Sequence, residues 1–156
     1  MTDQQKKILD RLRALCSRRE YCCADVLKKA KDALDGDLQA AQEVVDSLIK
    51  DKYVDDLRYA SAYARDKASI QGWGDVKIKY MLSAKGVASS VISEALLEID
   101  RDKSSSRLYK LLETKLRSLK DDPQYRLKLL RFALGRGYSY DDAIQAINHL
   151  LHQSHN

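Results

Sequence analysis

The segment 72–86, GWGDVKIKYMLSAKG, has residue types that could bind a phosphate group: a pair of glycines followed by three lysines. A glycine-rich loop that opens a helix can present backbone N–H groups to a phosphate. The dinucleotide-binding loop also needs a preceding strand and a third glycine, and the Walker loop needs a lysine followed by serine or threonine. Neither pattern is present. The sequence therefore excludes both nucleotide loops at this position.

The same segment is better interpreted as a helix. The alternation VKIKY would suit a strand, but it ends at Met81 and Leu82. On a helix, Met81, Leu82 and Ile78 share one side, which we expect to face the core. Lys77 and Lys79 then remain outside, and the glycine at position 86 is typical of a helix C-terminus.

Other reactive side chains do not form a catalytic or metal-binding pattern. Asp55 and Asp56 are adjacent, so they rarely aim at one point, and Asp55 as the N-cap of a helix explains its position without catalysis. Zinc-ligand residue types occur at Cys16, Cys22, Cys23, His149, His152 and His155, but at spacings unlike those of zinc sites. We predict no catalytic residues, no metal and no cofactor, and hence a protein that is not an enzyme.

Nearly the whole sequence carries apolar residues at helical spacing, and its one proline and six glycines stand at the breaks. We expect about nine helices and no strand. Asp122 and Pro123 are typical of a helix start, and that helix would place Leu127, Leu130 and Leu134 on one stripe. Ser139 should cap the last helix.

The helices fall into three similar groups. Lys52, Gly86 and Gly137 occupy equivalent breaks, and the apolar residues eight positions before them are Val44, Ile78 and Leu129. We predict an all-α fold of three tandem three-helix repeats, in an elongated, curved array of the right-handed type. The predicted repeats are 1–52, 53–102 and 103–156, and the most loop-like joint is 101–106, RDKSSS.

The net charge of +5 is unevenly distributed. Residues 104–136 hold nine Lys/Arg against three Asp/Glu, whereas residues 35–66 hold four against eight. Such a chain is expected to meet partners of both signs. No apolar run approaches the roughly 20 residues of a membrane span, the start resembles no secretory signal, and three clustered cysteines do not suggest disulfides. We expect a cytoplasmic protein without membrane contact.

The segments YVDDLRYASAYARDK, GWGDVKIKYMLSAKGV and RLKLLRFALGRGYSYDDAIQAI, taken in order, resemble the RecX family, bacterial regulators of the recombinase RecA. The matching positions are Tyr53, Val54, Asp55, Asp56, Arg58, Tyr59 and Ala60; Gly72, Trp73 and Gly74; and Arg136, Gly137 and Tyr138. Residues 15–30 look like the family's first helix pair. The sequence departs from the family at Lys52, where glycine is common, and at Cys22 and Cys23, which replace a polar pair.

The resemblance implies a function without chemistry: binding to RecA, or to its filament on single-stranded DNA, and inhibition of filament extension, ATP hydrolysis, strand exchange and co-protease activity. It thereby implies a role in DNA repair and the SOS response. We expect a monomer whose partners are RecA, its filament and single-stranded DNA directly. The residues expected to contact a partner, from charge and position, are Tyr53, Asp55, Asp56, Arg58, Trp73, Lys77, Lys79, Lys85, Arg107, Lys110, Lys115 and Arg136. The alternative is a basic helical-repeat module that binds nucleic acid directly, independent of RecA.

Overall fold

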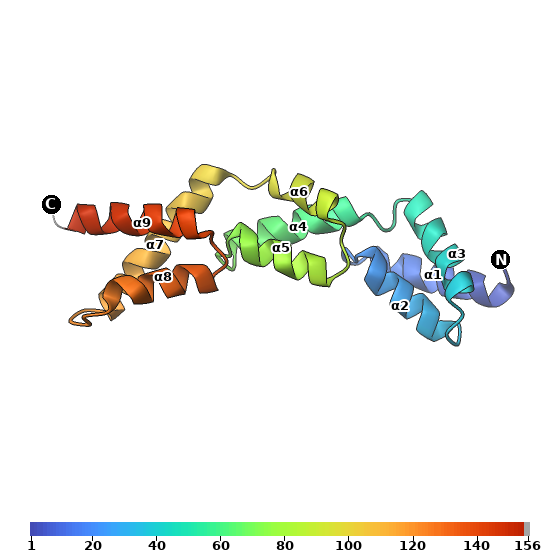
Figure 1. The fold of residues 1–156 in the computed structure, drawn as a ribbon. Helices are drawn as coiled ribbons and strands as arrows, with labels where there is room; N and C mark the ends of the chain where they lie inside the picture. Colours follow the sequence, from blue (N-terminus) through green and yellow to red (C-terminus); the bar gives the residue numbers. More distant parts are fainter. Residues whose placement is uncertain (155–156) are drawn as a thin grey trace. The chain divides into compact units, whose positions relative to one another are not determined.

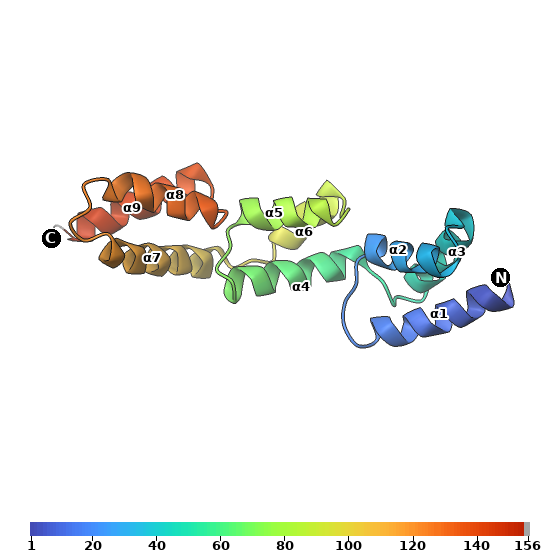
Figure 2. The same ribbon diagram turned by 90° about the horizontal axis from the view of Figure 1, so that it is seen from below.

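The computed structural model describes residues 1–154, and helices are the only regular secondary structure in this part of the chain (Figures 1 and 2). Its nine helices are α1 (Asp3–Cys16), α2 (Cys23–Ala33), α3 (Leu38–Lys50), α4 (Asp56–Ser69), α5 (Asp75–Ala84), α6 (Ser89–Leu96), α7 (Arg101–Ser118), α8 (Tyr125–Gly135) and α9 (Tyr140–Ser154). The prediction of an all-α chain of helical repeats is confirmed. None of the helices in this range has the length and hydrophobicity needed to span a bilayer.

The chain divides into two compact units. Unit 1 consists of residues 1–63 and 82–95, and unit 2 of residues 64–81 and the chain from Leu96 onward. Helices α4 and α5 each contribute residues to both units. The three predicted repeats have different boundaries, so the division at 52 and 102 stays a prediction.

In unit 1 the helices α1, α2 and α3 enclose one apolar core, which is the blue and cyan part of Figures 1 and 2. Thr2 begins α1 with a reciprocal cap: its hydroxyl accepts from the Gln5 N–H at 3.1 Å, and the Gln5 side chain accepts from the Thr2 N–H at 2.7 Å. The amide of Gln5 also donates to the Ala40 carbonyl at 3.1 Å. This buried glutamine therefore ties the start of α1 to α3.

In unit 2 the helices α7, α8 and α9 enclose a second core around fully buried Leu112, Leu129 and Ala133. Asp100 caps α7 by accepting from the Lys103 N–H at 3.1 Å. The segment 101–106, which we predicted as the most loop-like joint, is therefore the beginning of a helix. Its serines are tolerated there because they lie in the first turns, where side-chain hydrogen bonds compete least with the helix.

The start of α8 also differs from the prediction. The helix begins at Tyr125, because the Asp122 carboxylate closes a turn by accepting from the Gln124 N–H at 2.8 Å. Leu127 and Leu134, predicted on the buried stripe, are each 42% exposed, and the buried positions are Leu129 and Ala133. At the start of α9 the prediction is confirmed, since the Ser139 hydroxyl accepts from the Asp142 N–H at 3.1 Å.

The three equivalent breaks share one backbone geometry. Lys52, Gly86 and Gly137 all have left-handed φ values, of 63°, 79° and 93°. In each case the N–H of the next residue donates to the carbonyl of the residue five positions before it: Tyr53 to Leu48 at 2.9 Å, Val87 to Leu82 at 3.2 Å, and Tyr138 to Ala133 at 3.2 Å. This is the Schellman C-cap. The predicted equivalence of the breaks is confirmed, including at Lys52, which adopts the conformation without being glycine.

Candidate functional site

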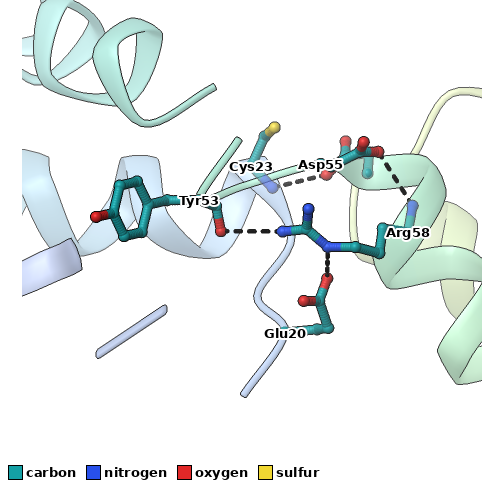
Figure 3. A network of polar contacts seen from close by, with 6 residues as sticks. Glu20, Cys23, Tyr53, Asp55 and Arg58 are labelled. Carbon is teal, nitrogen blue, oxygen red and sulfur yellow. Dashed lines mark hydrogen bonds and ion pairs between the residues drawn. The ribbon is translucent and has the colours of Figure 1, made fainter. Parts of the chain in front are cut away.

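The two adjacent aspartates at the start of α4 hold different parts of unit 1 (Figure 3). Asp55 accepts from the Arg58 N–H at 3.0 Å, so it is the N-cap of α4, as interpreted from the sequence. Asp56 accepts from the Cys23 N–H at 2.8 Å. Cys22, the N-cap residue of α2, makes no capping side-chain hydrogen bond. The carboxylate of Asp56 therefore supplies the cap that α2 lacks.

The Arg58 side chain bonds to residues of the same unit (Figure 3). Its Nε donates to Glu20 at 2.7 Å, and its Nη2 donates to the Tyr53 carbonyl at 3.3 Å. The Arg58 and Glu20 side chains are 43% and 34% exposed, so this ion pair contributes less than about 1 kcal/mol of stability. The Arg13 guanidinium lies over the Tyr53 ring, with its central carbon 5.6 Å from the ring centroid. All four predicted contact residues around Asp55 thus have partners within the chain.

In unit 2 the two glycine motifs meet at a site that we call the glycine joint, formed by residues 74–77 and 136–137. The Gly74 N–H donates to the Arg136 carbonyl at 2.9 Å, and the Val76 N–H donates to the Gly137 carbonyl, also at 2.9 Å. A Cβ atom at Gly74 would lie 2.5 Å from the Gly137 carbonyl oxygen, which is too close for any side chain. The residue at position 74 must therefore be glycine, which has no Cβ.

The tyrosine that follows Gly137 adds a bond to the first glycine of the other motif. The Tyr138 hydroxyl donates to the Gly72 carbonyl at 3.1 Å, over a separation of 66 residues. Burial raises the pKa of Tyr138, so its phenol remains a neutral donor at neutral pH. The glycine–tryptophan–glycine and arginine–glycine–tyrosine motifs therefore form one structural contact.

Unit 1 contains a similar contact, the cysteine joint, formed by residues 22–25 and 85–86. The Cys22 thiol lies 3.7 Å from the Lys85 carbonyl, to which it donates, and the Lys85 ammonium lies 3.6 Å from Asp25. A Cβ at Gly86 would contact the Ala24 Cβ at 3.3 Å. In both joints a left-handed C-cap glycine and the carbonyl before it face the first residues of a helix.

Several predicted cations are held inside unit 2. Arg107 donates to the Ala68 carbonyl at 2.9 Å, and Arg136 donates to the Gln71 carbonyl. Trp73 is half-buried, with the Lys67 and Lys77 ammonium groups 4.8 and 4.4 Å from its ring centroid. These distances suit cation–π contacts.

The remaining predicted cations are more available. Lys79 and Lys110 are exposed and make no ion pair within the described range, whereas the Lys115 ammonium lies 5.6 Å from the Phe132 ring centroid. Met81, which we placed in the core, is 36% exposed, so α5 carries only Ile78 and Leu82 inward. Further exposed cations of residues 104–136 that make no ion pair within the described part of the chain are Lys120, Arg126 and Arg131. They were absent from the predicted set, and the basic excess of residues 104–136 was the signal for them.

The net positive charge of the chain belongs to unit 2. Unit 2 holds 15 Lys/Arg against 10 Asp/Glu, whereas unit 1 holds 13 of each, so their formal net charges are +5 and 0. An anionic partner would therefore be attracted chiefly to unit 2. Among the described residues no group of three or more His, Cys, Asp or Glu side chains is placed to hold a metal ion, and His155 lies outside them.

Comparison with known proteins identifies similar sequences over most of the chain. The family models of the second and third three-helix domains of RecX match residues 55–96 and 104–147. The regulatory protein RecX of Clostridium tetani is 34% identical over 120 residues, which are 74% of this chain and 55% of that protein. The RecX of Clostridium botulinum (strain Eklund 17B) is 37% identical over 109 residues, or 67% of this chain and 50% of the relative. The chain spans about half the length of these curated relatives.

Solved structures show the same fold. A crystal structure of RecX from Lactobacillus salivarius superposes with a TM-score of 0.85, covering 96% of this chain and 98% of that one at 21% identity. A second crystal structure of a regulatory protein RecX has a TM-score of 0.84 at 23% identity, covering 94% of this chain and 72% of the other. At these identities the likeness concerns the arrangement of helices alone.

Proposed function

Since the chain belongs to the RecX family, we propose that it is a non-catalytic, cytoplasmic regulator of the recombinase RecA. In this proposal it binds RecA or the RecA filament on single-stranded DNA and inhibits filament extension, ATP hydrolysis, strand exchange and co-protease activity. It would thereby modulate recombinational repair and the SOS response. The observation that carries the proposal is the presence of two RecX three-helix domains, in order, on residues 55–96 and 104–147.

The charge distribution supports a division of labour in this binding. Unit 2 carries the whole net charge of +5, and its exposed lysines at 79 and 110 make no ion pair within residues 1–154. These lysines suit the phosphates of the filament's DNA or an acidic protein surface. In this proposal Asp55, Asp56 and Arg58 act indirectly: they hold parts of unit 1 together, and unit 1 would meet RecA.

The test is the single-stranded-DNA-dependent ATPase of RecA with and without this protein. We expect ATP hydrolysis to slow at amounts equimolar with RecA, and we expect the protein to sediment with RecA filaments. A heat-unfolded sample of the same protein is the control for nonspecific effects. An unchanged hydrolysis rate at equimolar protein would contradict the proposal.

A second candidate, a module that binds nucleic acid directly without RecA, is favoured by the +5 charge of unit 2. Each phosphate contact releases counterions, so affinity for an oligonucleotide alone would fall steeply with salt. Fluorescence anisotropy of a labelled oligonucleotide between about 50 and 200 mM salt measures this slope. Tight, salt-sensitive binding together with no effect on the RecA ATPase would favour this second function over the first.

A further inference from the structure

Unit 2 contains a small cavity lined by basic side chains. Its volume is about 270 Å³, and its walls come from the last residue of α4, from residues 70–72 that follow it, from α7 and from Arg136. Pockets for drug-sized ligands start at about 300 Å³, so this one suits a small group. Three of the residues expected from the sequence to contact a partner, Arg107, Lys110 and Arg136, line it together.

Main-chain carbonyls fix two of these cations in place. Arg107 donates from Nη1 to the Ala68 carbonyl at 2.9 Å, and Arg136 donates from Nη2 to the Gln71 carbonyl. A guanidinium has five N–H donors, so each retains donors after this bond. The guanidinium groups are thus pre-positioned without being neutralised, since a carbonyl carries no net charge.

The third cation stands on the same face of α7. Lys110 follows Arg107 by three residues and precedes Thr114 by four, which is the spacing of side chains on one helix face. Thr114 also lines the cavity. Lys110 is exposed and makes no hydrogen bond or ion pair in the described part of the chain. Its ammonium is therefore available to a ligand.

No carboxylate lines this cavity. Three charges act on the neighbouring Tyr138: the positive charges of Arg107 and Arg136, and the negative charge of Asp75. The Asp75 carboxylate is already bound to Arg101 at 2.7 Å. The Nε of Arg136 is buried and has no hydrogen-bond acceptor among the described residues. The cavity therefore gathers three positive charges with no anion of its own.

We propose that this cavity is a binding site for a phosphate group, held by Arg107, Lys110 and Arg136 with the Thr114 hydroxyl as a further donor. Guanidinium groups match phosphate oxygens with paired, charge-assisted hydrogen bonds, and a lysine adds a point charge. The phosphate comes either from the backbone of single-stranded DNA, a source that rests on the proposed function, or from free phosphate in solution. The two sources share the same chemistry and are separated by the test.

The test follows backbone amide chemical shifts of the full chain by NMR while inorganic phosphate, or an oligothymidylate, is added at constant ionic strength. We expect saturable shifts at Gly72, Lys110 and Thr114 with phosphate, and none with chloride. Lys110→Gln should weaken phosphate binding about tenfold, the order of one charge-assisted hydrogen bond. Lys103→Gln is the matched control, because Lys103 is an exposed lysine of the same helix that does not line the cavity.

The outcomes separate the sources. If DNA provides the phosphate, the oligothymidylate shifts the same amides and competes with inorganic phosphate. If it binds without shifting them, free phosphate is the ligand and the site stands. An absence of saturable shifts, or equal losses in Lys110→Gln and Lys103→Gln, overturns the site.

The RecA ATPase distinguishes this proposal from the proposed function. If the wild-type protein binds phosphate but leaves the RecA ATPase unchanged, the phosphate site stands and the proposed regulatory function is wrong. If the wild-type protein slows the RecA ATPase without binding phosphate, the proposed function stands and the phosphate site is wrong. The amide spectrum of Lys110→Gln without phosphate, compared with that of the wild type, checks that a lost signal reflects the lost charge rather than misfolding.

Discussion

At the scale of single residues, the glycine joint of unit 2 depends on the absence of two side chains. A Cβ at Gly137 would lie 2.2 Å from the Lys77 Cβ and 2.8 Å from the Lys77 backbone nitrogen. The φ of 93° at Gly137 adds backbone strain for any other residue. Because the obstructing atoms belong to the backbone and to a Cβ, no side-chain rotation can relieve the overlap.

Gly137→Ala is therefore expected to destabilise the protein by about 3 kcal/mol or more, because steric overlap and a left-handed φ act together. Urea unfolding monitored by circular dichroism measures the loss. The control is Gly135→Ala, two residues earlier, where nothing lies within 4 Å of an added Cβ and φ is not left-handed. That change should be neutral or slightly stabilising. Equal losses in both variants would show that the joint does not limit stability.

The thiols provide a second prediction at this scale. Burial raises the pKa of Cys16 and Cys22, and raises that of Cys23 to about 12 with Asp56 as a further cause. At pH 8 we expect all three to react with a disulfide reagent more slowly in the native protein than in guanidinium, because the thiolate is the reactive form. The measurement is the absorbance of the released reagent. Equally fast reaction in both states would contradict the assignment.

The raised pKa values of the three thiols also determine the direction in which stability changes with pH. The folded-state pKa values lie above the unfolded value of about 8.5, so the folded state favours the neutral thiols. Their contribution to stability is complete below that unfolded pKa. It is lost as the pH rises towards the folded pKa, which for Cys23 is about 12. We expect the urea midpoint to fall over this alkaline range.

At the scale of helices, the Schellman cap ends three of them in the same way. Glycine occupies the left-handed position at 86 and 137, but Lys52 occupies it after α3, with a φ of 63°. For a residue with a Cβ, this conformation costs about 1 kcal/mol of free energy. The Lys52 side chain is exposed and has no ion pair within the described residues, so nothing visible in the fold offsets that cost.

Lys52→Gly is accordingly expected to stabilise the protein by about 1 kcal/mol, which corresponds to a rise of about 2–4 °C in the melting temperature. Differential scanning calorimetry measures the shift. Lys50→Gly is the matched control, since Lys50 is an exposed lysine in the last turn of α3, where glycine should cost about 1 kcal/mol. A fall in melting temperature with Lys52→Gly would mean that Lys52 has a favourable contact in solution.

Helix identity could be predicted from the sequence because its signals are local. The apolar residues at 44, 78 and 129 stand eight positions before the three breaks, and all are fully buried. The predicted start of α8 was wrong because Asp122 closes a turn instead of capping the helix. Met81 was placed in the core because periodicity alone does not show how wide the covered stripe of α5 is.

The candidate site was less predictable, because its contacts join residues far apart in the sequence. Asp56 meets Cys23, and Arg58 meets Glu20, over 33 and 38 residues. A single sequence carries no signal for such pairs, so these charges looked available to a partner. The basic excess of 104–136 was visible as composition, but which cations stay unpaired depends on packing.

At the scale of the whole molecule, neither compact unit is a continuous stretch of sequence. Unit 2 needs residues 64–81 as well as the chain from Leu96 onward, because Gly72, Gly74 and Val76 bond to the turn after α8. The α7–α9 core itself lies wholly within the later part. The contribution of the glycine joint to unit 2 is therefore measurable by cutting the chain.

We expect a fragment of residues 64–156 to unfold at a higher urea concentration than a fragment of residues 96–156. Both fragments keep the α7–α9 core and the Asp100 cap, but the shorter one loses the three bonds from residues 72–76 and the partner of Arg136. Circular dichroism at equal concentration gives the two midpoints. Identical midpoints would mean that the joint adds nothing to the stability of α7–α9.

The two joints also bear on how such a chain can change its length during evolution. Each joint sets a C-cap turn against the first residues of a helix, and the closest contacts there involve main-chain atoms, a Cβ or a small side chain, with the Lys85–Asp25 ion pair and the Tyr138 hydroxyl as added contacts. Duplication of a repeat would copy both halves of such a joint, and the new unit could dock on its neighbour with few new complementary side chains. The gain or loss of a whole repeat would therefore be tolerated more readily than an insertion of a few residues at 74–77 or 136–137.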